Sequence, residues 1–118
     1  MTTSRYGRNL NVLAQGMVSG SSSGASISYK SFDDGKLSVS RLGEGRYRVS
    51  VPSNWGLIAG SYIVMATGKG YSAGSSSAPI KPTVVNLQST YFDIDTSDDA
   101  SRNDGSFMFQ IINLSDWL

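Results

Sequence analysis

The segment Leu37-Ser-Val-Ser-Arg-Leu-Gly-Glu-Gly-Arg-Tyr-Arg-Val-Ser-Val51 decides the fold class. Apolar and polar side chains alternate with a period of two on both sides of its Gly-Glu-Gly turn. Successive side chains of a strand point to opposite faces of a sheet. The pattern therefore predicts an antiparallel hairpin with one core face and one polar, basic face. The core face should hold Leu37, Val39, Tyr47, Val49 and Val51.

Similar patterns recur along the rest of the chain, separated by clusters of Gly and Ser. Alternation and runs of β-branched or aromatic residues predict strands, and we find no long window with the 3.6-residue period of a helix. Seven short strands with turns between them are typical of an all-β domain, either an antiparallel β-sandwich, a jelly roll or a small barrel. The predicted strands are residues 10–18, 25–32, 36–41, 46–51, 61–67, 83–95 and 106–114.

Length and composition limit the function. The chain has 118 residues, of which 39% are apolar, enough for one modest core. We expect a single β-sandwich domain over residues 12–118, preceded by a docking arm or disordered segment at residues 1–11. The chain has no Cys and no His, which excludes disulfides, thiolate or imidazole metal sites and Ser-His-Asp catalysis. We therefore expect no cofactor and no enzymatic activity.

Charge and targeting signals are weak. The formal net charge is +1, too small to indicate nucleic-acid binding or attraction to a membrane surface. Residues 1–20 lack a charged segment followed by an apolar run, so we expect no signal peptide. The longest apolar stretch, Tyr62 to Ala66, is far too short to span a bilayer. We expect a soluble protein without membrane insertion.

Two of the predicted strands, 61–67 and 106–114, are apolar on both faces. A two-layer sandwich of this size covers only one face of each sheet, so the second face needs another cover. Large apolar surfaces on soluble proteins mark interfaces. We therefore expect a second copy of the chain to cover this face, or alternatively the loop at residues 68–82. The residues expected in this oligomer interface are Ile63, Met65, Met108 and Ile112.

Charged residues alternate along two other strands. Arg46 and Arg48 lie on the polar face of the hairpin, and Asp93 and Asp95 lie outward on a later strand. We expect these four side chains to form ion pairs between strands or between subunits. As an alternative, the basic face that includes Lys36 could bind a phosphate or an anionic sugar.

The carboxylates also allow two chemical readings. Asp93, Asp95, Ser97 and Asp104 occupy ligand positions of a calcium loop, although Asp98 stands where that loop needs Gly and no helices flank it. A solvated loop after an alternating strand explains the same residues. A glycosidase would need two carboxylates set across a bond, with Glu44 or Asp93 as the candidates, and nothing in the sequence indicates a buried acid.

Aromatic residues in predicted loops are candidate contact points. Trp55 follows Pro52-Ser-Asn54, and Tyr71 lies in a Gly/Ser-rich stretch. Exposed rings of this kind can stack on sugars, so these two residues could form ligand or host-contact loops. Alternatively, they cap the open ends of the core, as Tyr6 and Trp117 could.

The order of motifs resembles a small β-domain of tailed-bacteriophage virion proteins, found at the ends of tail fibres, in head fibres and in receptor-binding knobs. The resemblance covers residues 12–114 and rests on the Gly-x-Gly-x-Tyr-x-Val hairpin of residues 43–49 and on three later segments. These segments are Tyr62-Ile-Val-Met-Ala-Thr67, Phe92-Asp-Ile-Asp-Thr96 and Asp104-Gly-Ser-Phe-Met-Phe-Gln-Ile111. Such domains are similar to the trimeric jelly rolls of tumour-necrosis-factor and complement globular heads. The resemblance thus implies a homotrimer whose apolar sheet faces meet at a three-fold axis.

The same resemblance implies a structural protein on the virion surface, made in the host cytoplasm. The chain lacks a coiled-coil stalk or shaft, so a knob, a fibre module or a decoration protein fits better than a full fibre. Its expected partners are further copies, capsid or tail proteins, and host-surface glycans. Arg5, Tyr6 and Arg8 would belong to the docking arm. The alternative from another functional class is a monomeric carbohydrate-binding module.

Overall fold

The computed structural model describes residues 11–31, 36–71, 79–98 and 101–114. These residues form eight strands and one short 3-10 turn, η1, at Ser53–Trp55. None of them forms a helix long and apolar enough to cross a bilayer. The strands are β1 (Asn11–Ser21), β2 (Gly24–Ser31), β3 (Ser38–Gly43), β4 (Arg46–Ser50), β5 (Tyr62–Lys69), β6 (Lys81–Leu87), β7 (Tyr91–Ser97) and β8 (Ser106–Asn113).

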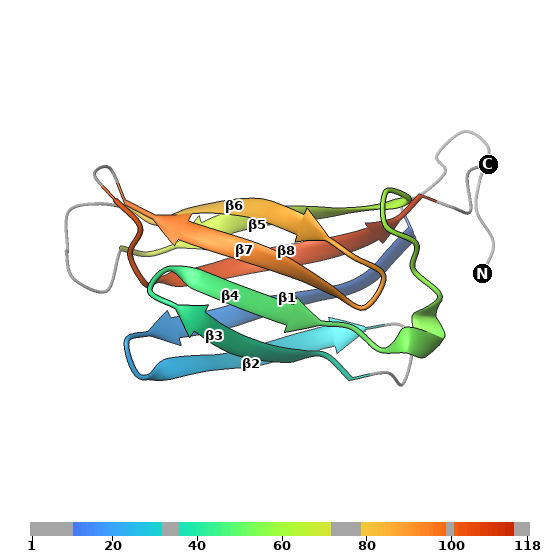
Figure 1. Cartoon of the computed structure of the whole chain (residues 1–118), viewed down its shortest axis with the longest axis horizontal. Helices are drawn as coiled ribbons and strands as arrows, with labels where there is room; N and C mark the ends of the chain where they lie inside the picture. The colour runs from blue at the N-terminus through green and yellow to red at the C-terminus, as the bar shows by residue number, and fades with distance from the viewer. Residues whose placement is uncertain (1–10, 32–35, 72–78, 99–100, 115–118) are drawn as a thin grey trace.

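The strands form two antiparallel sheets that face each other (Figure 1). Sheet A has the order β2-β1-β8-β5, and sheet B has the order β3-β4-β7-β6. The all-β prediction is confirmed, and the two layers are those of a β-sandwich. Three hairpins, β1–β2, β3–β4 and β6–β7, lie within a sheet, and the other connections cross between sheets.

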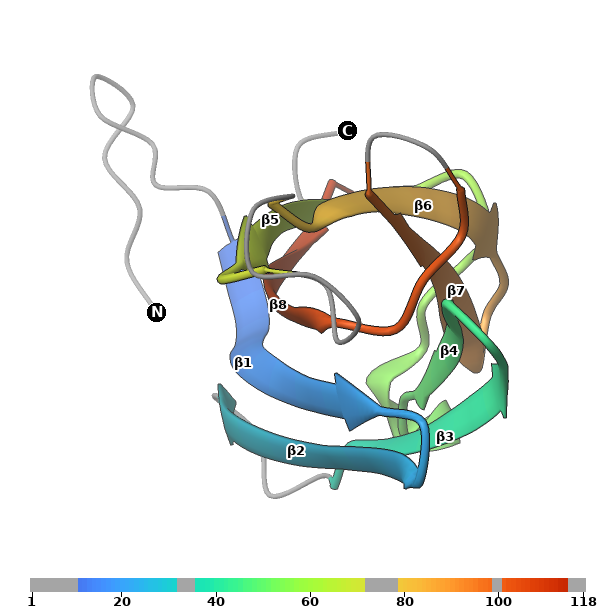
Figure 2. The same ribbon diagram turned by 90° about the vertical axis from the view of Figure 1, so that its left-hand side faces the viewer.

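The two sheets approach each other along both edges. Strand β5 lies beside β6, and β2 lies beside β3, so the eight strands surround the core in the end view of Figure 2. The connection from β5 to β6 begins as a hairpin, in which the Ile80 amide donates to the Gly70 carbonyl at 3.1 Å. Isolated pairing of Tyr71 with Pro79 extends it by one step.

The hairpin that fixes the fold class forms as predicted. Val39 pairs with Val49 and Arg41 with Tyr47 across β3 and β4, around the Glu44-Gly45 turn. Gly45 has a φ of +67°, a left-handed conformation that glycine adopts without strain. The predicted core face is confirmed, because Leu37, Tyr47, Val49 and Val51 are buried and Val39 packs against them.

Aromatic side chains from both sheets join the layers in the core. Phe92 of sheet B meets Phe109 of sheet A edge-on, with ring centroids 5.6 Å apart. Tyr47 of sheet B packs against Phe107 of sheet A at 5.8 Å. Tilted and edge-on contacts of this kind are the favourable arrangements of aromatic pairs. The alternation of β4, β7 and β8 thus places every second residue in one shared core.

The prediction of a single strand over residues 83–95 is wrong. The chain turns back at residues 88–90, so that β6 and β7 form a hairpin. The Gln88 backbone amide closes this turn by donating to the Tyr91 carbonyl at 2.9 Å. The turn Gln88-Ser-Thr90 contains neither Gly nor Pro, so it lacks the usual sequence signal. A tertiary contact holds it instead: the buried Tyr62 hydroxyl donates to the Gln88 carbonyl at 2.6 Å.

Tyr62 therefore links the edge of sheet A to a turn of sheet B. Its hydroxyl also lies 3.2 Å from the Tyr91 carbonyl oxygen. Burial raises the pKa of the phenol to about 12, although the contact with Gln88 lowers it somewhat. The hydroxyl is therefore protonated at neutral pH and can donate.

Tyr62→Phe should remove this link and leave the carbonyl of Gln88 short of a donor. We expect the free energy of unfolding to fall by about 1–2 kcal/mol, the usual effect of losing a hydrogen bond to a partly buried group. Urea denaturation would measure the change. Tyr71→Phe, at a ring that is 57% exposed, is the matched control and should have no effect. Equal stabilities of the two variants would contradict the role given to Tyr62.

Candidate functional site

The outer face of sheet A gathers exposed apolar side chains. Met65 is 55% exposed, Met108 39% and Ile63 37%, and half-buried Met17 lies opposite Met108 in the pairing of β1 with β8. Three of the four methionines of the chain are therefore on one sheet face. Their strands also supply the core, because Phe107, Phe109 and Ile111 alternate with Met108 along β8 and point inward.

Ile112 requires a correction to the predicted interface. It was expected on the exposed face with Ile63, Met65 and Met108, but it is fully buried. Its neighbours in register are Val12 on β1 and Ile63 on β5, so aliphatic side chains flank it on both adjacent strands. Ile112 therefore offers no accessible surface to a partner.

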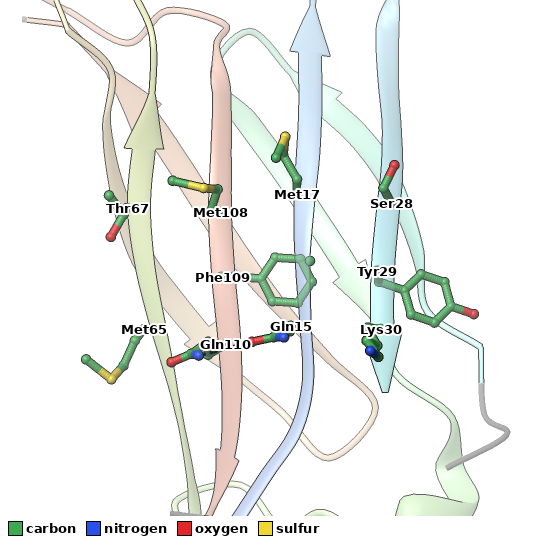
Figure 3. A pocket seen from close by; sticks show the side chains of 11 residues that line it. Gln15, Met17, Ser28, Tyr29, Lys30, Met65, Thr67, Met108, Phe109 and Gln110 are labelled. Atoms are coloured by element: carbon green, nitrogen blue, oxygen red, sulfur yellow. Dashed lines mark hydrogen bonds between the residues drawn. The ribbon is translucent and has the colours of Figure 1, made fainter. Parts of the chain in front are cut away.

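The face is hollowed between its outer strands. A depression of about 620 Å³ is lined by the three methionines, by Thr67 and by residues of β2. Figure 3 shows Met65, Met108 and Met17 around it, with Gln15 and Gln110 pointing toward each other. The Gln110 Nε2 amide donates to Gln15 Oε1 at 3.2 Å, across β8 and β1.

Loop residues do not cover this face in the described structure. Within the segment 68–82, residues 68–69 belong to β5, residues 81–82 belong to β6, and the Tyr71–Pro79 bridge continues their edge. Met65 remains more than half exposed beside them. The described parts of the segment therefore leave the face open.

Sheet A carries little charge. The residues of its four strands include two lysines, Lys30 and Lys69, and no acidic residue. Lys30 and Lys69 both lie on the outermost strands of the sheet, β2 and β5. The central strands β1 and β8 present only uncharged side chains.

The outer face of sheet B is a ladder of opposite charges. Arg46 lies opposite Asp95 and Arg48 opposite Asp93 in the pairing of β4 with β7. The Arg48 guanidinium contacts Asp93 through two hydrogen bonds, of 2.8 and 3.1 Å, and Arg46 lies 3.7 Å from Asp95. The structure thus brings the four predicted residues together as ion pairs between strands of one chain.

Neighbouring groups complete the ladder. The Asn86 amide donates to the Asp93 carboxylate at 2.9 Å, and the Arg48 guanidinium lies 3.9 Å from the centre of the Tyr91 ring. Burial alone would raise the pKa of Asp93, but the hydrogen bonds from Arg48 and Asn86 outweigh it and lower that pKa. Arg48, Asn86 and Asp93 therefore satisfy one another within the sheet.

A second carboxylate, Asp104, is buried between the sheets at one end of the sandwich. Arg41 binds it with two hydrogen bonds, of 3.1 and 2.8 Å. The Gly45 amide donates to it at 2.9 Å and the Tyr47 hydroxyl at 2.6 Å. Burial opposes ionisation, but these donors prevail and hold the pKa of Asp104 at about 2. Burial, and then the bond to Asp104, raises the pKa of Tyr47.

The calcium and glycosidase interpretations find little support in this geometry. Asp93, Asp95 and Asp104 each face an arginine. Among the described residues no group of three or more His, Cys, Asp or Glu is placed to hold a metal ion. Glu44 is exposed in the β3–β4 turn, so it lacks the apolar surroundings of a catalytic acid.

The two loop aromatics differ in their placement. Trp55 lies in η1 and packs against the core, and its buried Nε1 has no hydrogen-bond partner among the described residues. Tyr71 projects outward beside the end of β5. Trp55 thus offers little free ring surface, whereas Tyr71 offers a ring face. The predicted docking-arm residues Arg5, Tyr6 and Arg8, and also Trp117, lie outside the described residues.

Comparison with known proteins adds no relative. No family model, curated protein or solved structure matches the chain significantly. The contrast between the two outer faces, one ion-paired within the chain and the other with exposed apolar side chains and charge only on its outermost strands, is therefore the main structural guide to function.

Two clusters were missed from the sequence. Arg41 alternates in phase with Leu37 and Val39, so the sequence pattern already indicated that it points inward. An inward-pointing arginine requires a buried anion, which is Asp104. The Gln15–Gln110 pair had a weaker signal: each residue lies two positions from an outward methionine. Pairing them required the register of strands 95 residues apart, which no local pattern supplies.

The Asp104 cluster predicts acid sensitivity. A carboxyl whose pKa is lowered on folding stabilises the protein above its unfolded pKa, near 4, and this contribution is lost as the pH falls toward 2. The shift corresponds to roughly 2 kcal/mol. Asp104→Asn should be less stable than the wild type at pH 7 and lose less stability between pH 4 and 2. Urea denaturation across this range would measure both slopes, and parallel slopes would contradict the assignment.

Proposed function

We propose that this protein is a structural subunit of a tailed-bacteriophage virion that assembles with copies of itself through the outer face of sheet A. One observation carries the proposal: Ile63, Met65 and Met108 are exposed together on a sheet face whose central strands carry no charge. Exposed apolar side chains gathered on one face of a small domain mark an interface. The motif order that resembles phage virion domains supplies the biological setting.

The chemistry of the face favours a second copy as its occupant. Burial of each methionine side chain contributes about 1.5–3 kcal/mol, and flexible methionines adapt their shape to a partner. Identical faces bring identical charges together, so a face whose two lysines, Lys30 and Lys69, lie only on its outermost strands can meet its own copy with no like charges at its centre. Sheet B lacks this property because its surface is crossed by charged side chains.

The finer form of the proposal is a homotrimer of the tumour-necrosis-factor-like, jelly-roll type. Three copies would turn their sheet A faces toward a common axis, which leaves the charged sheet B faces outward on the virion surface. Capsid or tail proteins would then bind the outer parts of the assembly or the arm that contains Arg5, Tyr6 and Arg8. The exposed ring of Tyr71 would be available to a host glycan.

A purely structural role agrees with the state of the charged groups. The carboxylates of Asp93, Asp95 and Asp104 are held by arginines. Such carboxylates stabilise strands, whereas a general acid or base needs a free carboxyl with a raised pKa. The proposed mechanism is therefore assembly and attachment, without a chemical step.

Sedimentation at micromolar concentration tests the assembly. We expect the wild type to sediment as a closed oligomer, and Met65→Ser combined with Met108→Ser to raise the dissociation constant by about 100-fold or more, because two anchors are lost. Val85→Ser is the matched control, since Val85 is also 39% exposed but belongs to sheet B. A monomeric wild type would refute self-association.

A second experiment addresses the biological setting. An antibody against the protein should label purified phage particles from an infected host at regular positions in electron micrographs. A monomer that binds a glycan array, and loses that binding in Tyr71→Ala, would instead support the carbohydrate-binding module. Absence of label from particles would remove the virion assignment even if the protein forms oligomers.

A further inference from the structure

We propose that the amide pair Gln15–Gln110 fixes the register of the interface between copies by forming hydrogen bonds from one copy to the next. This inference rests on the proposed function, because it concerns the same face of sheet A. It assigns a role to the polar groups of that face, which the apolar contacts leave unexplained. The methionines would supply affinity, and the two glutamines would select one arrangement.

The position of the pair sets it apart from a peripheral contact. Gln15 and Gln110 lie on the two central strands of sheet A and are partners in the β1–β8 register. Met17 and Met108 form the next outward pair on one side, Met65 lies beside Gln110 on β5, and Lys30 lies beside Gln15 on β2. A partner that covers the methionines must therefore also cover the glutamines. Figure 3 shows the two amides between Met65 and the β2 edge of the face.

The hydrogen-bonding capacity of the pair is incomplete within one copy. Each glutamine amide carries an NH₂ group with two donors and a carbonyl oxygen that accepts. Gln110 Nε2 donates to Gln15 Oε1, which leaves the NH₂ group of Gln15 and the carbonyl of Gln110 without a partner in this pair. Exchange of the oxygen and nitrogen positions in both amides still leaves one donor group and one acceptor. Water satisfies these groups on a free face.

The remaining donor and acceptor are complementary to each other. In a closed assembly of identical copies, the donor group of each copy can face the acceptor of the next, and the ring of hydrogen bonds closes for a dimer or a trimer. A displaced register would bury both groups against methionine side chains. A buried amide without a partner weakens association by about tenfold or more. The pair would thus favour one register among several apolar contacts of similar affinity.

Leucine substitutions at the two positions separate register from affinity. Gln15→Leu or Gln110→Leu alone leaves one amide unpaired in the interface, and we expect about tenfold weaker association. The double variant removes both amides, so we expect association at least as tight as in the wild type, but with several stoichiometries. Native mass spectrometry and sedimentation would measure masses and dissociation constants. Gln88→Leu, at the remaining glutamine and far from this face, is the matched control.

Side-chain NH₂ resonances give a readout that needs no glutamine variant. The signals of Gln15 and Gln110 should differ between the wild-type assembly and the Met65→Ser/Met108→Ser protein, whereas that of Gln88 should not. An oligomeric wild type with unchanged amide signals, or a double leucine variant with one unaltered stoichiometry, would overturn the register role and leave the proposed function standing. A monomeric wild type would overturn both.

Discussion

A single buried carboxylate ties the two layers of this sandwich together. Asp104 lies in the connection from sheet B to sheet A and accepts hydrogen bonds from Arg41, Gly45 and Tyr47, all in the β3–β4 hairpin. An unpaired carboxylate at this depth would be strongly destabilising, so the hairpin and the β7–β8 connection must be in place together. At the other end, Tyr62 of sheet A binds the β6–β7 turn of sheet B. The chain, which contains no cysteine, thus closes both ends of its barrel-like core with polar contacts.

The placement of charged residues, inside the sandwich and on the outer face of sheet B, determines what each surface can bind. Arg41 and Asp104 neutralise each other inside, and Arg46, Arg48, Asp93 and Asp95 neutralise one another on sheet B. Sheet B therefore completes its interactions within one chain. The central strands of sheet A carry no charged side chains, and their outward methionines, Met17 and Met108, stay partly exposed in one copy. The asymmetry follows from the sequence of the strands, since the acidic residues of the eight strands all lie in β7.

The sequence reveals those parts of the structure that depend on local alternation. Tyr47 and Val49 were placed in the core because they alternate with arginines, and the outward phase of Ile63, Met65 and Met108 followed from the same rule. The turn after Leu87 was not predicted because its sequence contains neither Gly nor Pro. A hydrogen bond from Tyr62 stabilises it instead. The burial of Ile112 was not predicted because alternation along β8 puts it in the same phase as the exposed Met108. Local periodicity gives the face of a residue, but long-range register decides which side chains meet on that face.

The cost of desolvation favours the outer face of sheet A over that of sheet B as the surface for self-association. If sheet B were the interface, the guanidinium groups of Arg46 and Arg48 and the carboxylates between them would lose water, and the cost of desolvating such ions equals or exceeds what their attraction returns. Their partners are already in place, so a second copy would add few new contacts to offset that cost. On sheet A, the groups that lose water are mainly methionine and isoleucine side chains, whose burial is favourable, and two amides that can find partners in the next copy. The charged residue that lines the same depression, Lys30, lies on the edge strand β2, where its ammonium group can stay in water. An assembly built from this chain should therefore place sheet A inside and sheet B outside, whatever its rotational symmetry.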